Sequence, residues 1–341
     1  MSSIIQGAIV VKDLIQKLVE AWGPSGYEHH VRALIQAEVQ PFVDEMTVDA
    51  LGNLICRVGS GPKKIMMAAH MDEIGIMVTF REPKSGYLRF AGLGGLIQTT
   101  LHGNRVRFED GTVGVVAAPD AFGASRTTAP DLDSFYIDVT DGSTADAITP
   151  GCPAVFWRPM ESRGSRLISK SMDDRVGCAV AIETMRRLQK QTPHSLYFVF
   201  TVQEEVGIRG ARPAAFSVEP DLAIALDVCP TGDEIKGERN AVKLGGGAAI
   251  KLQDTGVIVP PAVRDWMVNR AEADKIPYQF ELIKAGTTDA AGIQVARAGV
   301  PSGCISIPCR YVHTTSETVD LADVEACVGL LTGLLSHAVS I

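Results

Sequence analysis

The chain of 341 residues lacks the features that point to nucleic acid or to a membrane. Acidic residues outnumber basic ones, 40 to 32, and the net charge of −8 argues against nucleic acid as the main partner. No apolar stretch approaches the roughly 20 residues that a membrane helix needs. The mildly apolar N-terminus has no basic leader, so we expect neither a signal peptide nor a membrane partner.

Cysteine motifs, aromatic residues and a serine nucleophile motif are also few or missing. The seven cysteines are scattered and include no Cys-x-x-Cys pair, which predicts reduced, buried thiols and a cytoplasmic protein. Aromatic residues make up 6% of the chain, too few for the long aromatic-lined cleft of a glycosidase. No Gly-x-Ser-x-Gly motif occurs, which argues against a serine hydrolase.

The chain does contain the alternating helix and strand patterns of an α/β protein. Apolar periodicity predicts helices within residues 11–40, interrupted at residues 23–26, and residues 41–58 predict extended structure around a turn at 49–52. The apolar run 65–69 predicts a buried strand. Further segments follow after residue 170, namely helix 173–189, strand 196–202, strand 222–227, helix 261–275, strand 300–307 and helix 320–338. We expect a central, mostly parallel sheet flanked by helices.

Between about residues 74 and 165 the pattern changes to short strands separated by glycine and polar turns. Six such runs occur, at 76–80, 87–90, 105–108, 113–117, 135–139 and 154–157. They predict a small β-barrel or sandwich, and residues 118–132 predict a long mobile loop. We therefore expect a discontinuous α/β domain of residues 1–72 plus 166–341, interrupted by a β-rich domain of residues 73–165.

Five short segments place histidine or carboxylate at the ends of predicted strands or at the start of a helix. They are His70-Met-Asp72, Asp173-Asp174, Glu204-Glu205, Asp227 and His313. The carboxyl ends of parallel strands meet at one edge of an open α/β sheet, and ligands bind there. We therefore expect these residues to converge in space although they are far apart in the chain.

The pair Glu204-Glu205 is the most informative of these segments. It follows directly on the apolar run 195–203, and two carboxylates at such a strand end cost desolvation and repel each other. A bound cation offsets that cost. Imidazole and carboxylate ligands suit zinc, cobalt or manganese, and their number fits two ions about 3.5–4 Å apart. Two ions would activate a water molecule, and a carboxylate that is not a ligand would take its proton.

Each segment also has a purely structural explanation when it is taken alone. Glu204-Glu205 fits a solvated loop, and Asp173-Asp174 fits a helix N-cap with an acidic first turn. A single histidine at a strand end is more often packed in a core or exposed to solvent, and Asp227 fits a loop cap. Their occurrence together at the strand ends of one sheet favours a common site.

The motifs that carry the chemistry also carry a family resemblance. They are Ala68-Ala-His-Met-Asp-Glu-Ile-Gly75, Ser171-Met-Asp-Asp-Arg-Val-Gly177, Thr201-Val-Gln-Glu-Glu-Val-Gly-Ile-Arg-Gly-Ala211, Ala225-Leu-Asp227 and Gly299-Val-Pro-Ser-Gly-Cys-Ile-Ser-Ile-Pro-Cys-Arg-Tyr-Val-His313. In order and spacing, from about residue 11 to 335, the chain resembles the glutamyl-aminopeptidase-like metallopeptidases, also called TET-type (tetrahedral) aminopeptidases. The fold expected from this resemblance is a zinc-peptidase-like α/β domain interrupted by a small β-barrel-like dimerisation domain.

The resemblance implies a role for each residue of the first metal site. His70 would bind one ion, and Asp72 would orient its imidazole. Asp173 would bridge this ion and a second one, and its peptide bond to Asp174 would be cis. Asp227 would complete the ligands of the first ion.

The resemblance also implies the second site and the assembly. Glu205 and His313 would bind the second ion, whereas Glu204 would be the general base. The inserted domain would be a dimerisation domain, and dimers would assemble into a tetrahedral dodecamer. Two departures from the family pattern concern assembly and access rather than ligands, namely residues 314–317 and the loop 118–130.

The leading functional prediction is a metal-dependent aminopeptidase that removes N-terminal amino acids from short peptides. Two alternatives stay open, a dinuclear metal deacylase of N-acyl amino acids or amides and a non-catalytic assembly protein on the same scaffold. Residues 286–290 resemble a loop that lines the substrate pocket of the family, although they also fit an ordinary turn. Neutral or apolar N-terminal residues are the expected substrates, with four basic residues available for an acidic one, namely Arg209, Arg212, Lys284 and Arg310.

Overall fold

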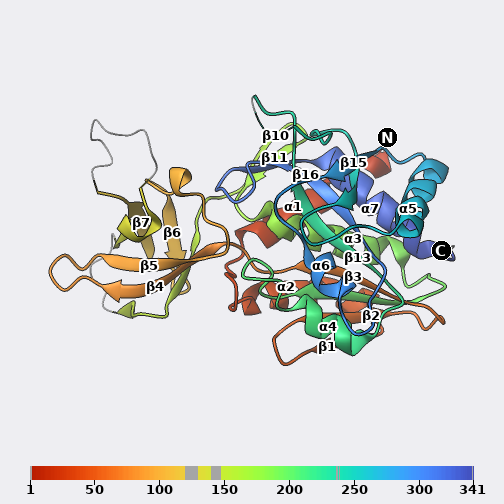
Figure 1. Cartoon of the computed structure of the whole chain (residues 1–341), viewed down its shortest axis with the longest axis horizontal. Coiled ribbons are helices and arrows are strands. Elements are labelled where there is room, and N and C mark those ends of the chain that lie inside the picture. The colour runs from red at the N-terminus through yellow and green to blue at the C-terminus, as the bar shows by residue number, and fades with distance from the viewer. Residues whose placement is uncertain (1, 120–129, 140–146, 236, 238, 340) are drawn as a thin grey trace.

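The computed structural model describes residues 2–119, 130–139, 147–235, 237, 239–339 and 341. It has two parts, a large α/β body and a β-barrel that projects from one side of it (Figure 1). The predicted fold class, an α/β protein with an inserted barrel, is confirmed. Of the predicted loop 118–132, residues 120–129 lie outside the described part of the chain.

The α/β body is built on one mixed sheet, to which eleven strands of the described residues belong. Their order is β1-β2-β12-β3-β13-β16-β17-β11-β10, and β14 pairs with β16 and β15 beside this path. The bounds are β1 (Glu45–Val48), β2 (Leu54–Val58), β3 (Lys64–His70), β10 (Glu161–Arg163), β11 (Arg166–Ser169), β12 (Ser195–Thr201), β13 (Leu222–Pro230), β14 (Ala248–Gln253), β15 (Tyr278–Leu282), β16 (Ser302–Arg310) and β17 (Glu317–Asp320).

Parallel pairing is concentrated at the centre of this sheet. The neighbours β12, β3, β13 and β16 are parallel, and so are β14 and β15. Both ends of the main path are antiparallel, since β1–β2 and β10–β11 are hairpins. In the first hairpin the Asp49 carboxylate accepts the N–H groups of Leu51 and Gly52, and Gly52 has a φ of +106°. The predicted turn at residues 49–52 is therefore confirmed, and its tightness explains the antiparallel edge.

Helices cover both faces of the sheet. On one face lie α1 (Ser2–Glu20), α2 (His29–Val39), α3 (Met172–Leu188), α5 (Pro261–Asp274) and α7 (Leu321–Ser336). On the other face lie the shorter helices α4 (Ala211–Val218) and α6 (Asp289–Gln294). The side chains of the central strand β3 pack against both helical layers. Met67 packs into the core beside α3 and α7, and Met66 packs into the core beside α4 and α6. Alternate side chains of a strand point to opposite faces, which explains its uninterrupted apolar sequence.

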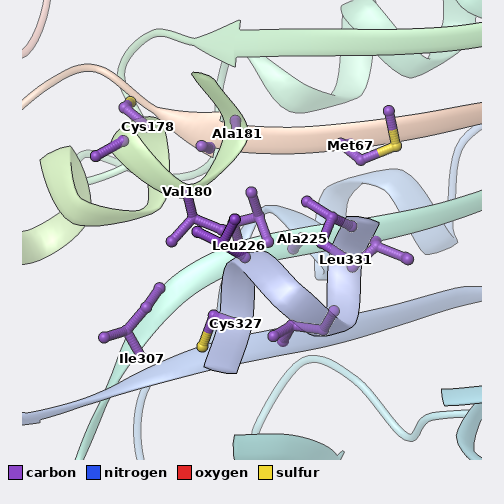
Figure 2. Packing of buried hydrophobic residues seen from close by; sticks show 14 of the residues in the cluster. Met67, Cys178, Val180, Ala181, Ala225, Leu226, Ile307, Cys327 and Leu331 are labelled. Carbon is purple, nitrogen blue, oxygen red and sulfur yellow. The ribbon is translucent and has the colours of Figure 1, made fainter. Parts of the chain in front are cut away.

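The larger core lies between α3, α7 and the central strands. Figure 2 shows Met67 of β3, Val180 of α3, Leu226 of β13, Ile307 of β16 and Leu331 of α7 within this cluster. All of these side chains are buried. Six of the seven cysteines are buried too, and all seven are free, as the sequence predicted.

The barrel is closed by six strands in the order β4-β5-β8-β7-β6-β9. Their bounds are β4 (Gly75–Arg81), β5 (Leu88–Leu93), β6 (Arg105–Phe108), β7 (Val113–Ala117), β8 (Tyr136–Val139) and β9 (Pro153–Phe156). All six match the runs expected from the sequence, and the structure selects a barrel over a sandwich. A separate apolar core fills it, with Ile76, Val106 and Ile137 fully buried.

The sequence interpretation missed several short elements, namely β10, β11, β14, β15, β17, α4 and α6. Of these, β10 and β11 join the large sheet through β17 rather than the barrel. Each is a segment of three to eight residues, which is too short for an apolar period to separate it from a loop. Among the described helices, none combines the length and apolar composition required to cross a bilayer.

Candidate metal centre

The predicted site residues lie at the carboxyl edge of the parallel strands. His70 is the last residue of β3, and Glu204 and Glu205 follow the end of β12 at Thr201. Asp227 lies within β13, near its carboxyl end, and His313 follows β16 after a short turn. The sheet thus brings to one edge four segments that are separated along the chain, which is the convergence that parallel pairing predicts.

Asp173 lies between the two histidines. Its Oδ1 is 2.9 Å from Nε2 of His70, and its Oδ2 is 3.4 Å from Nε2 of His313. Nε2 of His313 is also 3.3 Å from Oε2 of Glu205. A carboxylate that presents one oxygen to each of two imidazoles has the arrangement of a bridge between two cations.

Ligand-type atoms gather into two overlapping groups around His70. One group contains His70, Asp173 and Glu205, and the other contains His70, Asp174 and Asp227, with the atoms of each group within 4.8 Å of one another. Asp174 was not among the predicted ligands. Its carboxylate accepts the backbone N–H groups of Gly177 at 3.1 Å and His70 at 3.3 Å, so it also fixes the start of α3 against β3.

The Asp173–Asp174 peptide bond is cis, as the family resemblance implied. Neither residue has helical backbone angles, so the regular part of α3 begins after them. Glu317 of β17 holds this segment from the other side. Its Oε2 accepts the N–H of Asp173 at 3.1 Å, and its Oε1 accepts the N–H of His313 at 2.8 Å.

Asp72 is fully buried beneath the cluster and connects three of its parts. Its Oδ1 is 3.4 Å from Nδ1 of His70, on the side of the ring away from Asp173. The same carboxylate accepts the N–H of Glu204 at 3.0 Å and of Glu205 at 3.2 Å, and the Ser25 hydroxyl donates to it at 2.6 Å. Nδ1 of His70 also lies 3.1 Å from the carbonyl oxygen of Asp72, so Asp72 flanks this side of the ring while Nε2 faces Asp173. That Asp72 orients the imidazole stays a prediction.

The barrel also contributes to the centre. Nδ1 of His313 lies 2.8 Å from the carbonyl oxygen of Gly95, which follows β5. Because a carbonyl can only accept, Nδ1 of His313 donates its proton to Gly95, and Nε2 is the ring nitrogen that faces Asp173 and Glu205. No signal in the sequence indicated that a barrel residue would orient this histidine.

Several buried carboxyl groups lie close together in the centre, and their pKa values are raised. Burial, followed by repulsion from Asp173, raises the pKa of Glu205 to about 8. Burial, together with the charges of Asp227, Asp289 and Glu205, raises the pKa of Glu204 well above its usual range. Burial and Asp173 likewise raise the pKa of Asp227. Carboxyl groups with raised pKa values in one place indicate that something positive belongs among them.

The pKa values of the two histidines and of Asp173 shift so as to favour the charged form of each group. Burial lowers the pKa of His313, but the carboxylates of Asp173 and Glu205 outweigh it and raise that pKa to about 10. Burial raises the pKa of Asp173, but hydrogen bonds from His313 and His70 outweigh it and hold the pKa below its usual value. The carboxylates around Asp173 thus favour positive charge at this position.

The residues present fit divalent metal ions. Oε1 of Glu205 is buried and has no hydrogen-bond partner within the described chain, and an ion would satisfy it. Two imidazole nitrogens and several carboxylate oxygens form a donor set typical of zinc, cobalt or manganese. A donor set of this kind at the carboxyl edge of an α/β sheet is typical of the class of metal-dependent hydrolases.

The comparisons with known proteins agree with this class. An aminopeptidase from the archaeon Desulfurococcus kamchatkensis is 36% identical and superimposes with a TM-score of 0.91, covering 97% of this chain and 96% of that one. The TET1 peptidase of Pyrococcus horikoshii, which can assemble into a tetrahedron or a large octahedral shell, is 31% identical with a TM-score of 0.86. The match to the TET1 peptidase covers 96% of this chain and 100% of that chain.

Sequence comparison identifies the family. A putative aminopeptidase from Acetivibrio thermocellus is 44% identical over 322 residues, which are 94% of this chain and 96% of that protein. The profile of the M42 glutamyl aminopeptidase family matches residues 52–330. The chain belongs to this family, so the resemblance recognised in the sequence motifs is confirmed.

Proposed function

We propose that this protein is a metal-dependent aminopeptidase that removes N-terminal amino acids from short peptides. The observation that carries the proposal is the position of Asp173 between Nε2 of His70 and Nε2 of His313. Membership of the M42 family supports the peptidase activity. The buried, partnerless oxygen of Glu205 supports metal dependence.

Two divalent ions, zinc or cobalt with manganese as a further candidate, are the proposed cofactors. His70, Asp173 and Asp227 would hold one, and Asp173, Glu205 and His313 would hold the other. When bound, such ions supply Lewis acidity and lower the pKa of a water molecule. The chain's part would be to hold these ligands in place. Asp72 accepts the N–H of Glu205, and Glu317 accepts the N–H groups of Asp173 and His313.

Glu204 is the proposed general base. Its carboxylate has no predicted role as a ligand, and its backbone is fixed by Asp72. Burial and neighbouring carboxylates raise its pKa, which favours proton uptake. Glu204 would take the proton of the attacking water and give it to the amine that leaves when the peptide bond breaks.

The proposed substrates carry a free N-terminal amine. The centre has an excess of buried carboxylates, among them Asp289, whose Oδ1 has no partner within the described residues. Such an environment favours an ammonium group over an acylated amine. For the side chain we favour neutral or apolar residues, because Arg310 is paired with Asp233 at 2.6 Å and so is already occupied.

The same centre would serve a deacylase of N-acyl amino acids, and a panel of aminoacyl-p-nitroanilides separates the two activities. Purified protein is assayed as isolated, after chelation, and after zinc or cobalt is restored. Metal-restored release from unblocked substrates, with N-acetylated ones untouched, is the expected result. Release from N-acyl amides alone would indicate the deacylase, and bound metal without any turnover would indicate an assembly protein.

We further propose a homo-oligomer in the cytoplasm. The division into a catalytic part, residues 1–72 plus 166–341, and a dimerisation part, residues 73–165, would place the barrel between subunits. The tetrahedral, dodecameric assembly of the Pyrococcus horikoshii TET1 peptidase supports the proposal that dimers of this chain assemble into a tetrahedral dodecamer. The free, buried cysteines support a reducing compartment.

A further inference from the structure

A second cluster of metal-ligating side chains lies where α2 meets the barrel. His29 and His30 are the first two residues of α2, and Glu109 follows β6 in the turn before β7. Nε2 of His29 is 2.9 Å from Oε1 of Glu109, and Nε2 of His30 is 3.1 Å from the same oxygen. About half of each side chain is exposed, 45% for His29, 52% for His30 and 47% for Glu109.

The spacing of these atoms is close to that of ligands on one ion. All three lie within 4.8 Å of one another. Ligand atoms about 2.0–2.2 Å from a tetrahedral ion are roughly 3.3–3.6 Å apart. The two His–Glu109 distances, 2.9 and 3.1 Å, differ from that spacing by a few tenths of an ångström. Two imidazoles and one carboxylate prefer zinc, nickel or copper to magnesium or calcium, which prefer oxygen ligands alone.

The buried side chain of Trp22 contacts both histidines and the strand that precedes Glu109. Its side chain is only 7% exposed, and its ring packs edge-on against those of His29 and His30 at centroid distances of 6.3 and 5.8 Å. The indole N–H donates to the carbonyl of Arg107 in β6 at 3.1 Å. Trp22 thus fixes both the start of α2 and the strand that leads to Glu109, so the ligands are brought together by the fold.

The cluster is accessible and separate from the catalytic centre. It borders an open groove of about 640 Å³, lined by residues that include Trp22, His30, Leu34, Arg107 and Glu109. It shares no residue with the predicted catalytic ligands. The groove gives an ion a path to the cluster and leaves room for water in the fourth position.

We propose that His29, His30 and Glu109 form a second metal site, which takes a divalent ion of the zinc, nickel or copper type. Three protein ligands and a water molecule complete its coordination. Because two ligands belong to α2 and one to the barrel, the bound ion ties the α/β body to the barrel. A simple ion pair between Glu109 and a protonated imidazole would make the same contacts without binding metal, so metal titration distinguishes the two.

The test counts zinc in the intact protein by equilibrium dialysis. Wild-type protein, His30→Gln and Glu109→Gln are compared with His337→Gln, which removes an exposed histidine near the C-terminus. We expect the first two variants to bind one zinc ion per subunit fewer than wild type, and His337→Gln to match wild type. The comparison is a difference, so it holds whatever number of ions the catalytic centre takes.

Trp22 provides a second readout. A copper ion beside both histidine rings quenches the fluorescence of a tryptophan within about 6 Å, so copper added to zinc-loaded protein should quench Trp22. The quenching should disappear in His30→Gln and Glu109→Gln and persist in His337→Gln. Equal zinc counts in all four proteins, or equal quenching in all four, would overturn the proposal.

Discussion

Oδ1 of Asp72 accepts a hydrogen bond from the backbone N–H of Glu204 at 3.0 Å. Through this contact the residue that orients the His70 imidazole also fixes the proposed general base. A substitution of Asp72 should therefore affect both the binding of metal and the position of the proposed base.

Changing Asp72→Asn should weaken metal binding and lower turnover together. An asparagine has one acceptor oxygen in place of two, so it cannot keep the contacts to Glu204, Glu205 and Ser25 at once. A loss of about 10- to 100-fold in metal affinity or activity is typical for such a residue. Metal titration and kcat/KM are the measurements. Ser25→Ala, which removes one of these donors, should have a much smaller effect.

Changing Glu204→Gln should abolish turnover and leave the metal content intact. The amide cannot take a proton, and loss of a general base costs about 10²- to 10⁴-fold in rate. Glu205→Gln is the matched control, since it changes the neighbouring carboxylate to the same amide but should lower the metal content. Activity that survives Glu204→Gln would show that another residue is the base.

Changing Glu317→Gln should loosen both metal sites at once. Glu317 accepts the N–H groups of Asp173 and His313, and a glutamine would turn its own NH₂ group toward one of them. A buried donor facing another donor costs about 1–3 kcal/mol. We expect lower metal affinity and a lower unfolding midpoint. Glu325→Gln, an exposed change on α7 that loses only the surface ion pair with Arg187, should leave both near wild type.

The sequence predicted the convergence of the site better than the contacts within it. Apolar runs that end in His70, Glu204 and His313 are readable because buried parallel strands have a simple composition and end at a common edge. The strand containing Asp227 was found for the same reason. The sheet is less parallel than expected, because both of its ends, β1–β2 and β10–β11, are antiparallel hairpins joined by short turns.

The supporting residues could not be found in this way. Glu317 lies on a four-residue strand, and Gly95 lies in a barrel loop more than 200 positions from His313 in the chain. Their roles depend on which backbone groups face them, and no periodicity records that. The assignments of ligands and base came from motif resemblance, and they stay predictions until the variants above are measured.

The metal-free protein should lose stability as the pH rises from about 5 to 8. Burial and repulsion from Asp173 raise the pKa of Glu205 and Glu317 from 4.5 to about 8, so folding takes up protons in this range. His313 adds to the effect above pH 6.5, because its pKa of about 10 keeps it protonated after the unfolded chain has lost that proton. A protein that binds more protons in its folded state than in its unfolded state becomes less stable as pH rises.

Bound metal replaces these protons, so the stabilisation of the folded protein by zinc should grow with pH. Melting temperatures of chelated and zinc-loaded protein at pH 5, 6, 7 and 8 measure this, and a gap that narrows with pH would contradict it.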